Sequence, residues 1–226
     1  MRAIERPEYL GKLISKIDNK MVKVITGIRR SGKSFLLFNL FYNYLISQDI
    51  KKDQIIKISF DNIENEELLD LKKLYEFLNE KTAKKDVRYF VMLDEVQFLI
   101  TTKELKSKDQ YVRLYALLNG LLQKGNVDVY VTGSNSKMLS QDVLTEFRGR
   151  GDNIHIAPLS FSEYFQAHSG TKFEAWNDYL LYGGMPYIFQ LKSESEKVNY
   201  LTNLNNEIFL KDICERYNIS NKSSLE

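Results

Sequence analysis

The chain has 226 residues, of which 43% are hydrophobic and 27% are charged, the balance of an ordinary globular protein. Its formal net charge is only +2, so no strong overall field indicates nucleic acid or a membrane surface as the partner. No apolar run approaches the ~18 residues of a membrane helix, the N-terminus has no signal-peptide pattern, and the single cysteine, Cys214, excludes a disulfide within the chain. We therefore expect a cytoplasmic protein.

The first elements are predicted in the order helix, strand, loop, helix. A short helix is expected at residues 7–17 and a buried strand at 21–26. Residues 27–34 then read GIRRSGKS, which matches the pattern G-x-x-x-x-G-K-[ST], and residues 35–45 read as a largely buried helix. A basic surface turn is the alternative for the loop. The strand before it and the helix after it favour a phosphate-binding loop.

Each part of this loop has a chemical task. Its glycines let consecutive backbone N–H groups converge on phosphate oxygens, and the helix that follows favours negative charge at its start. Lys33 would reach the β- and γ-phosphates, and the hydroxyl of Ser34 would ligate Mg²⁺. The residues expected to bind the nucleotide are Gly27, Ile28, Arg29, Arg30, Ser31, Gly32, Lys33, Ser34 and Phe35.

A second part of the site is expected about sixty residues later. A strand at 55–60 and a helix with apolar residues at helical spacing over 68–78 come first. An apolar strand then begins at residue 87 and ends in Asp94 and Glu95. Asp94 would hold the Mg²⁺ shell, and Glu95 would act as the general base on the attacking water. An Asp-Glu pair also ends many ordinary strands, so Asp94 and Glu95 indicate a nucleotide site only in combination with the loop at 27–34.

Further candidates follow the next strand. A helix over 114–122 leads to a strand at 127–132, after which come the polar residues Ser134 and Asn135. Ligands of parallel sheets bind beyond the carboxyl ends of the strands. One of these two side chains would therefore contact the γ-phosphate or the lytic water, or it would cap the next helix; the sequence leaves both interpretations open.

Two arginines, Arg148 and Arg150, precede the fifth strand at 153–158. A guanidinium at this place could stabilise charge on the transferring phosphoryl group, and the alternative is a solvated basic turn. The chain beyond reads as helical at residues 160–168, 174–182 and 195–217.

These elements predict an α/β fold in which a five-stranded parallel sheet is sandwiched by helices and a small helical domain follows. We place the nucleotide-binding core at residues 1–158 and a lid-like helical domain at 159–226.

Taken together, the motifs resemble those of AAA-type P-loop ATPases of the extended group that includes the STAND NTPases. They resemble more closely a bacterial and archaeal "ATP-binding protein" family whose members often carry an uncharacterised C-terminal domain. The matching segments are TGIRRSGKS at 26–34, LDEVQ at 93–97, TGSNS at 132–136, GR at 149–150, PLSFSEY at 158–164 and YGGMP at 182–186.

The resemblance implies several properties. ATP is the expected nucleotide, and the chain also lacks the Asn-Lys-x-Asp motif that reads guanine. Arg6 and Tyr9 would lie near the adenine. The Gly-Gly-x-Pro segment would either report the nucleotide state or form a simple helix corner. Arg150, which fits the position better than Arg148, would complete the site of a neighbouring copy in a homo-oligomer. Family members commonly continue past residue 226, so we expect a trimmed chain.

The predicted function is that of a Mg²⁺-dependent ATPase that acts as a regulatory switch or as the driver of a partner domain. One alternative is a nucleotide-gated scaffold that does not hydrolyse ATP, and another is an ATPase linked to nucleic acid. The partner is expected to be a protein or a nucleic acid and not a membrane.

Overall fold

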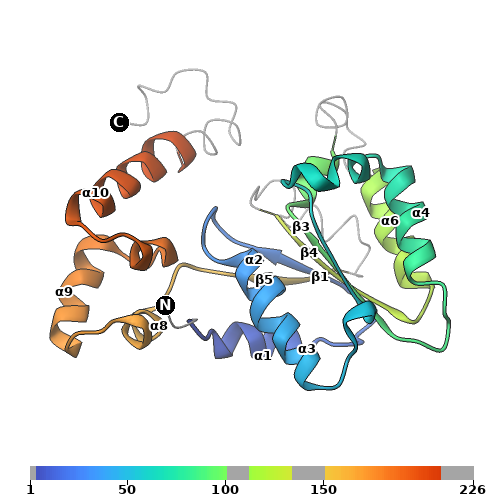
Figure 1. Ribbon diagram of the computed structural model, residues 1–226, viewed down its shortest axis with the longest axis horizontal. Helices are drawn as coiled ribbons and strands as arrows, with labels where there is room; N and C mark the ends of the chain where they lie inside the picture. The colour runs from blue at the N-terminus through green and yellow to red at the C-terminus, as the bar shows by residue number, and fades with distance from the viewer. Residues whose placement is uncertain (1–3, 101–111, 134–150, 210–226) are drawn as a thin grey trace. The chain divides into compact units, whose positions relative to one another are not determined.

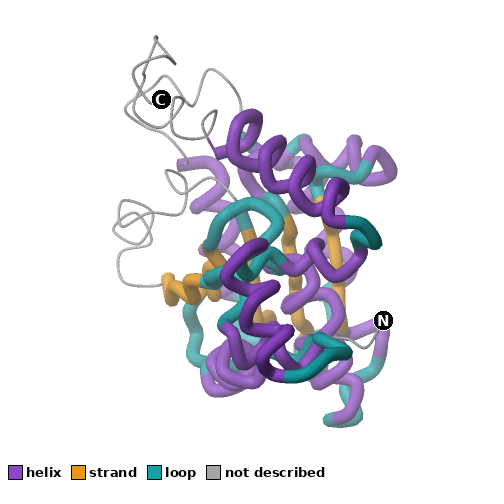
Figure 2. Tube along the Cα trace, turned by 90° about the vertical axis from the view of Figure 1, so that its left-hand side faces the viewer, coloured by secondary structure: helices purple, strands orange, loops and turns teal. Residues whose placement is uncertain are grey.

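The computed structural model describes residues 4–100, 112–133 and 151–209 (Figure 2). The predicted sites at Ser134, Asn135, Arg148 and Arg150 therefore lie outside the described residues. The chain forms two compact units. The sheet unit comprises Arg6–Gly27 and Lys33–Ile156, and the helical unit comprises Met1–Glu5, Ile28–Gly32 and Ala157–Glu226.

The sheet unit is built on five strands: β1 (Val22–Thr26), β2 (Ile55–Ser59), β3 (Tyr89–Asp94), β4 (Val127–Thr132) and β5 (Gly151–His155). Their order in the sheet is β2-β3-β4-β1-β5, and all neighbouring strands are parallel (Figure 1). The α/β fold predicted from the sequence is confirmed. The order places β4 between β1, which leads into the glycine-rich loop, and β3, which ends in Asp94.

Helices cover both faces of this sheet (Figure 1). One face packs against α1 (Pro7–Ser15), α2 (Lys33–Phe35), η1 (Leu36–Phe41) and α3 (Tyr42–Ser47). The other packs against α4 (Leu71–Lys81) and α6 (Val112–Gln123). The sheet unit also contains the short 3₁₀ turns η2 (Lys52–Gln54), η3 (Ile63–Leu69) and η4 (Val96–Leu99). Because successive strand residues point to opposite faces, Val22 and Val24 contact the second group while Ile25 contacts the first.

The helix predicted at residues 35–45 is interrupted by a π-helical segment, η1. Leu36, Leu37 and Phe41 of this segment are fully buried against the sheet. The wider π turn therefore keeps the apolar side chains on the core face, which a pattern of apolar residues alone does not reveal.

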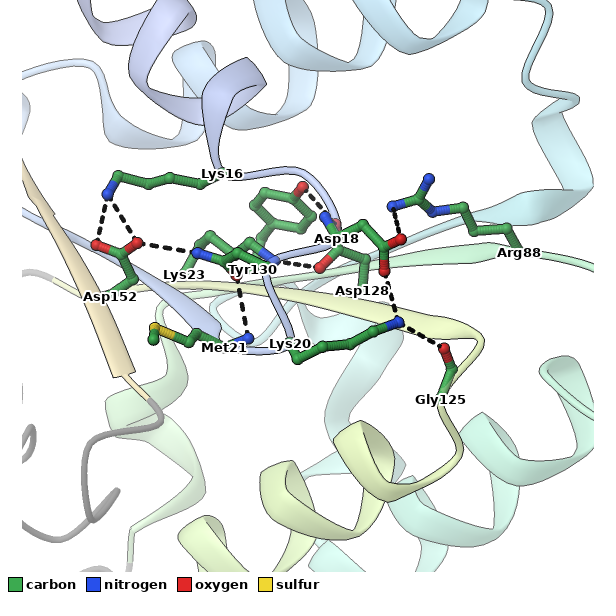
Figure 3. Close-up of polar contacts among 11 residues, drawn as sticks. Lys16, Asp18, Lys20, Met21, Lys23, Arg88, Gly125, Asp128, Tyr130 and Asp152 are labelled. Atoms are coloured by element: carbon green, nitrogen blue, oxygen red, sulfur yellow. Dashed lines mark hydrogen bonds and ion pairs between the residues drawn. The ribbon is translucent and has the colours of Figure 1, made fainter.

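The amino ends of β1 and β4 are joined by a buried ion pair between Lys23 and Asp128, whose side chains are 0% and 5% exposed (Figure 3). The same carboxylate accepts hydrogen bonds from the Tyr130 hydroxyl at 2.8 Å and from the backbone N–H of Asp18 at 3.0 Å. Burial lowers the pKa of Lys23, although Asp128 acts in the opposite direction. This network ties the loop between α1 and β1 to the centre of the sheet, at the end opposite to the glycine-rich loop.

The helical unit contains α8 (Phe161–Ala167), α9 (Lys172–Tyr182), η5 (Pro186–Gln190), α10 (Glu194–Asn203) and η6 (Leu204–Phe209). The three α-helices begin with a reciprocal capping box, in which a Ser or Thr side chain and a Glu three residues later bond each other's backbone N–H groups. No helix in the described ranges is long and apolar enough to cross a membrane.

The segment Gly183-Gly184-Met185-Pro186 forms the corner between α9 and η5. Gly183 ends α9 with φ +68°, a backbone conformation that favours glycine. The carbonyl of Gly184 accepts a hydrogen bond from the N–H of Leu159 at 2.7 Å. A Cβ atom at residue 184 would lie 2.2 Å from the Leu159 carbonyl oxygen, so the two backbones meet at a distance that only glycine allows.

Candidate functional site

The glycine-rich loop has the backbone of an anion-binding turn. Gly27, Arg30 and Gly32 have positive φ angles of 149°, 64° and 96°, and the N–H of Ser31 bonds the carbonyl of Ile28 at 3.2 Å. Successive backbone N–H groups in a turn of this kind can form a concave site for an anion. Two of these positions are glycine, as the motif predicts, and the third is an arginine in the left-handed region.

Lys33 is the first residue of the helical stretch after this loop, and its side chain folds back toward Gly27. Its Nζ donates a hydrogen bond to the carbonyl of Gly27 at 3.1 Å, and the residue is only 3% exposed. The ammonium group therefore lies over the turn whose N–H groups would receive phosphate oxygens, as the motif predicts.

Asp94 is the centre of a cluster of hydroxyl groups. Its Oδ1 accepts hydrogen bonds from Ser34 Oγ at 2.9 Å and from Thr132 Oγ1, and its Oδ2 lies 3.1 Å from Ser59 Oγ. The residue Asp94 is 3% exposed. Burial raises its pKa, and the hydrogen bonds from Thr132 and Ser34 act in the opposite direction. The structure thus brings together Ser34 and Asp94, which are 60 residues apart in the chain.

Strand order and alternation explain this cluster. Ser59 is paired in register with Asp94, and Leu93 with Val131, so that the next residues, Asp94 and Thr132, end neighbouring strands. Their side chains point to the sheet face that carries α2, because the residues before them, such as Leu93 and Val131, point into the core on the α4 and α6 face. Polar groups from the ends of β2 and β4 therefore bond Asp94 at the end of β3, and Asp94 in turn bonds Ser34 of α2.

Glu95 follows Asp94 in an unusual backbone conformation. Its φ and ψ angles are 56° and 49°, in the left-handed region that glutamate seldom adopts. Its N–H donates to Thr132 Oγ1 at 3.1 Å, and its Oε2 accepts a hydrogen bond from Gln97 Nε2. A left-handed residue held from two sides at a strand end is the kind of feature that accumulates at functional sites.

The donor set fits Mg²⁺. Ser34 Oγ and Asp94 Oδ1 are hard oxygen ligands that already lie within hydrogen-bonding distance of each other. Proteins commonly hold Mg²⁺ through one or two side chains, with phosphate oxygens and water completing the octahedron. In the described part of the chain no group of three or more His, Cys, Asp or Glu residues could form an all-protein metal site.

Two residues of this cluster, Thr132 and Ser59, were not among the sequence-predicted site residues, whereas Gln97 was the next candidate for the base after Glu95. Strand alternation predicts which sheet face Thr132 and Ser59 point to. It identifies them as neighbours of Asp94 only when the strands beside β3 are also known. Arg6 and Tyr9, predicted near the adenine, pack against each other, with the guanidinium carbon 4.4 Å from the ring centroid. Their role toward a nucleotide stays a prediction.

Comparisons with known proteins bear on the family and the fold of this chain. The model of a family described as AAA domain matches residues 19–165. An uncharacterised protein of Haemophilus influenzae is 30% identical over 228 residues, which cover 99% of this chain and 54% of that protein. The chain spans about half the length of the curated relatives it matches.

Two solved structures have the same fold. The Walker-type ATPase of Pyrococcus abyssi is 17% identical, with a TM-score of 0.61 over 96% of this chain and 77% of that one. AMPPCP-bound DnaA from Aquifex aeolicus is also 17% identical, with a TM-score of 0.50 over 94% of this chain and 64% of that one. At this level of identity the likeness concerns the fold alone.

Proposed function

Because this chain belongs to the AAA-domain family of P-loop ATPases, we propose that it binds ATP together with Mg²⁺, hydrolyses it, and uses the cycle as a regulatory switch or as the driver of a partner domain. The observation that carries the proposal is the contact between Ser34 Oγ and Asp94 Oδ1 at 2.9 Å. It joins the end of the phosphate loop to the acidic end of β3, and the two motifs have their expected chemistry only when they meet.

The residues have distinct tasks in this proposal. Lys33 neutralises charge on the β- and γ-phosphates, and the N–H groups of the loop bind the phosphate oxygens. Ser34 and Asp94 would hold Mg²⁺, which when bound supplies positive charge to the phosphate oxygens. Glu95 orients the attacking water and accepts its proton as the water oxygen bonds to the γ-phosphorus and the bond to the leaving ADP oxygen breaks.

The contacts of the phosphate loop support the proposed switch. Residues Ile28–Gly32 group with the C-terminal helices in the helical unit. Within that unit the guanidinium carbon of Arg30 lies 5.5 Å from the ring centroid of Tyr200, on α10. Phosphate bound by the loop would attract the same guanidinium, so nucleotide would compete with this contact. The division into a core at 1–158 and a lid-like domain at 159–226 stays a proposal, and it differs from the two compact units in assigning the loop residues Ile28–Gly32 to the core.

The decisive test is the substitution Glu95→Gln, which preserves shape and removes the base. We expect ATP to bind with unchanged affinity by calorimetry and turnover to fall by about 10²-fold or more. Glu80→Gln, on the exposed side of α4, is the matched control and should behave as wild type. Wild-type protein that binds ATP without turnover, with or without DNA or RNA, would instead support the non-hydrolysing scaffold.

A homo-oligomer completes the proposal. In it Arg150 of one copy acts on the nucleotide of the next, as the family resemblance implies. Mixing Arg150→Ala with Lys33→Ala should restore part of the turnover, because each variant supplies what the other lacks. Absence of rescue, with turnover per molecule independent of protein concentration, would indicate a monomeric enzyme.

A further inference from the structure

We propose that Gln97 is a positioning residue for the hydrolysis suggested above: its side-chain amide holds the carboxylate of Glu95 in the orientation from which it activates water. The inference rests on the proposed function. It starts from the hydrogen bond in which Gln97 Nε2 donates to Glu95 Oε2.

Gln97 is carried by a turn that the protein core holds in place. It belongs to the 3₁₀ turn η4, whose residues Val96 and Leu99 are buried in the core on the α4 and α6 face of the sheet. Within the turn, the N–H of Phe98 bonds the carbonyl of Glu95 at 3.1 Å, and the N–H of Ile100 bonds the carbonyl of Gln97 at 3.2 Å. The amide therefore extends from a fixed backbone and is itself partly buried.

The backbone of Glu95 is fixed as well, so the remaining freedom lies in its side chain. The N–H of Glu95 donates to Thr132 Oγ1, and Thr132 is bonded in turn to Asp94. A glutamate side chain has three rotatable bonds, and a backbone held in the left-handed region determines only where that side chain begins. An amide donor on one carboxylate oxygen limits the rotation that would otherwise move the carboxylate away from the water.

The chemistry of glutamine suits this task. An amide N–H donates to a carboxylate and orients it, and because the group is neutral it adds no charge beside the phosphates. The amide oxygen is far too weak a base to take the proton from water, so Gln97 would act through Glu95 and not in its place. Misplacing a catalytic group by about 1 Å can lower a rate by ~10²-fold, so even a partial loss of orientation should be measurable.

The test compares three single variants by steady-state kinetics. We expect Gln97→Ala to lower kcat by about 10-fold or more while KM and the calorimetric Kd for ATP stay within about twofold, because the amide acts only on the attacking step. Gln97→Glu keeps the shape but cannot donate to Glu95 as an amide does, and it should show a similar loss. Phe98→Ala alters the exposed residue next to it in the same turn and should keep wild-type kcat.

A double-mutant cycle then separates positioning from general structural damage. In a Glu95→Gln background, Gln97→Ala and Gln97→Glu should cause no further loss of kcat, because the group they position is already absent. Losses that multiply, or a kcat that rises when Gln97 is replaced, would overturn the inference. Wild-type turnover with unaffected Gln97 variants removes this inference alone, whereas absence of wild-type turnover removes the proposed function and this inference with it.

Discussion

The hydroxyl of Thr132, at the end of β4, donates a hydrogen bond to the carboxylate of Asp94, at the end of β3. The hydroxyl oxygen of Thr132 also accepts a hydrogen bond from the N–H of Glu95 at 3.1 Å. One side chain therefore links the proposed metal ligand to the backbone of the proposed base. Both of its bonds are shielded from water, since Thr132 is fully buried.

Replacing Thr132 by valine tests whether the link between Asp94 and Glu95 matters for activity. The change preserves volume but removes the hydrogen bond from the Glu95 N–H and one of the two that Asp94 Oδ1 accepts, the other coming from Ser34. Loss of a hydrogen bond to a buried polar group costs about 1–3 kcal/mol. We expect lower thermal stability and a loss of ATP turnover of at least about 10-fold. Thr132→Ser retains the hydroxyl and should recover most of the turnover. A Thr132→Val protein with wild-type turnover would show that the bridge does not matter for activity.

Substitution of Lys33 should act on binding. We expect Lys33→Ala to weaken ATP binding at least tenfold, or by roughly 1.4 kcal/mol, because the ammonium group lies over the phosphate loop. Isothermal calorimetry measures this directly. Lys85→Ala, at an exposed lysine before β3, removes the same charge elsewhere and should leave the affinity unchanged. Equal affinities for all three proteins would contradict the assignment of Lys33.

The ion pair between Lys23 and Asp128 should be sensitive to the loss of one partner. Asp128→Asn leaves a fully buried ammonium group without its counter-ion, and removal of one member of a buried pair costs about 3–5 kcal/mol. Urea denaturation followed by circular dichroism measures the change in the free energy of unfolding.

The double variant Lys23→Met with Asp128→Asn is the informative control for that pair. It removes the ammonium group, while the asparagine oxygen still accepts from Tyr130 and the Asp18 N–H. It should therefore be more stable than Asp128→Asn alone. Glu8→Gln, which breaks an exposed pair with Lys12, should not measurably change the unfolding midpoint. If the double variant is the least stable, the charge of Lys23 is not what makes Asp128 necessary.

The helix corner at Gly184 gives a prediction about the helical unit. A Cβ atom there would lie 2.2 Å from the Leu159 carbonyl oxygen, so Gly184→Ala must displace one backbone and should destabilise this unit by about 1–3 kcal/mol. The fluorescence of Trp176, on α9, reports its unfolding. Gly11→Ala is the opposite case, because a Cβ atom there meets nothing within 4 Å and alanine is favoured in helix α1 by up to about 1 kcal/mol. Equal effects at the two glycines would rule out the close contact.

Some features of the site could be predicted because they are local. The loop at 27–34 needs glycines, a lysine and a serine at set spacings in one short stretch, and the strand before Asp94 is visible as a continuous apolar run. The π-helical segment within 36–41 could not be predicted in this way, because α- and π-helical turns place similar apolar residues against a sheet.

The amino-acid sequence by itself determined the phosphate loop, the acidic end of β3, the alternation of strands and helices, and hence the fold class. These depend on backbone preferences and side-chain chemistry within short segments. Only the tertiary structure decided that β4 lies between β1 and β3, which places Thr132 beside Asp94 and pairs Lys23 with Asp128. Strand order depends on contacts between residues that are distant in the chain, and the pattern within each strand is compatible with several orders. The residues that link the two motifs therefore became visible only when the strands were side by side.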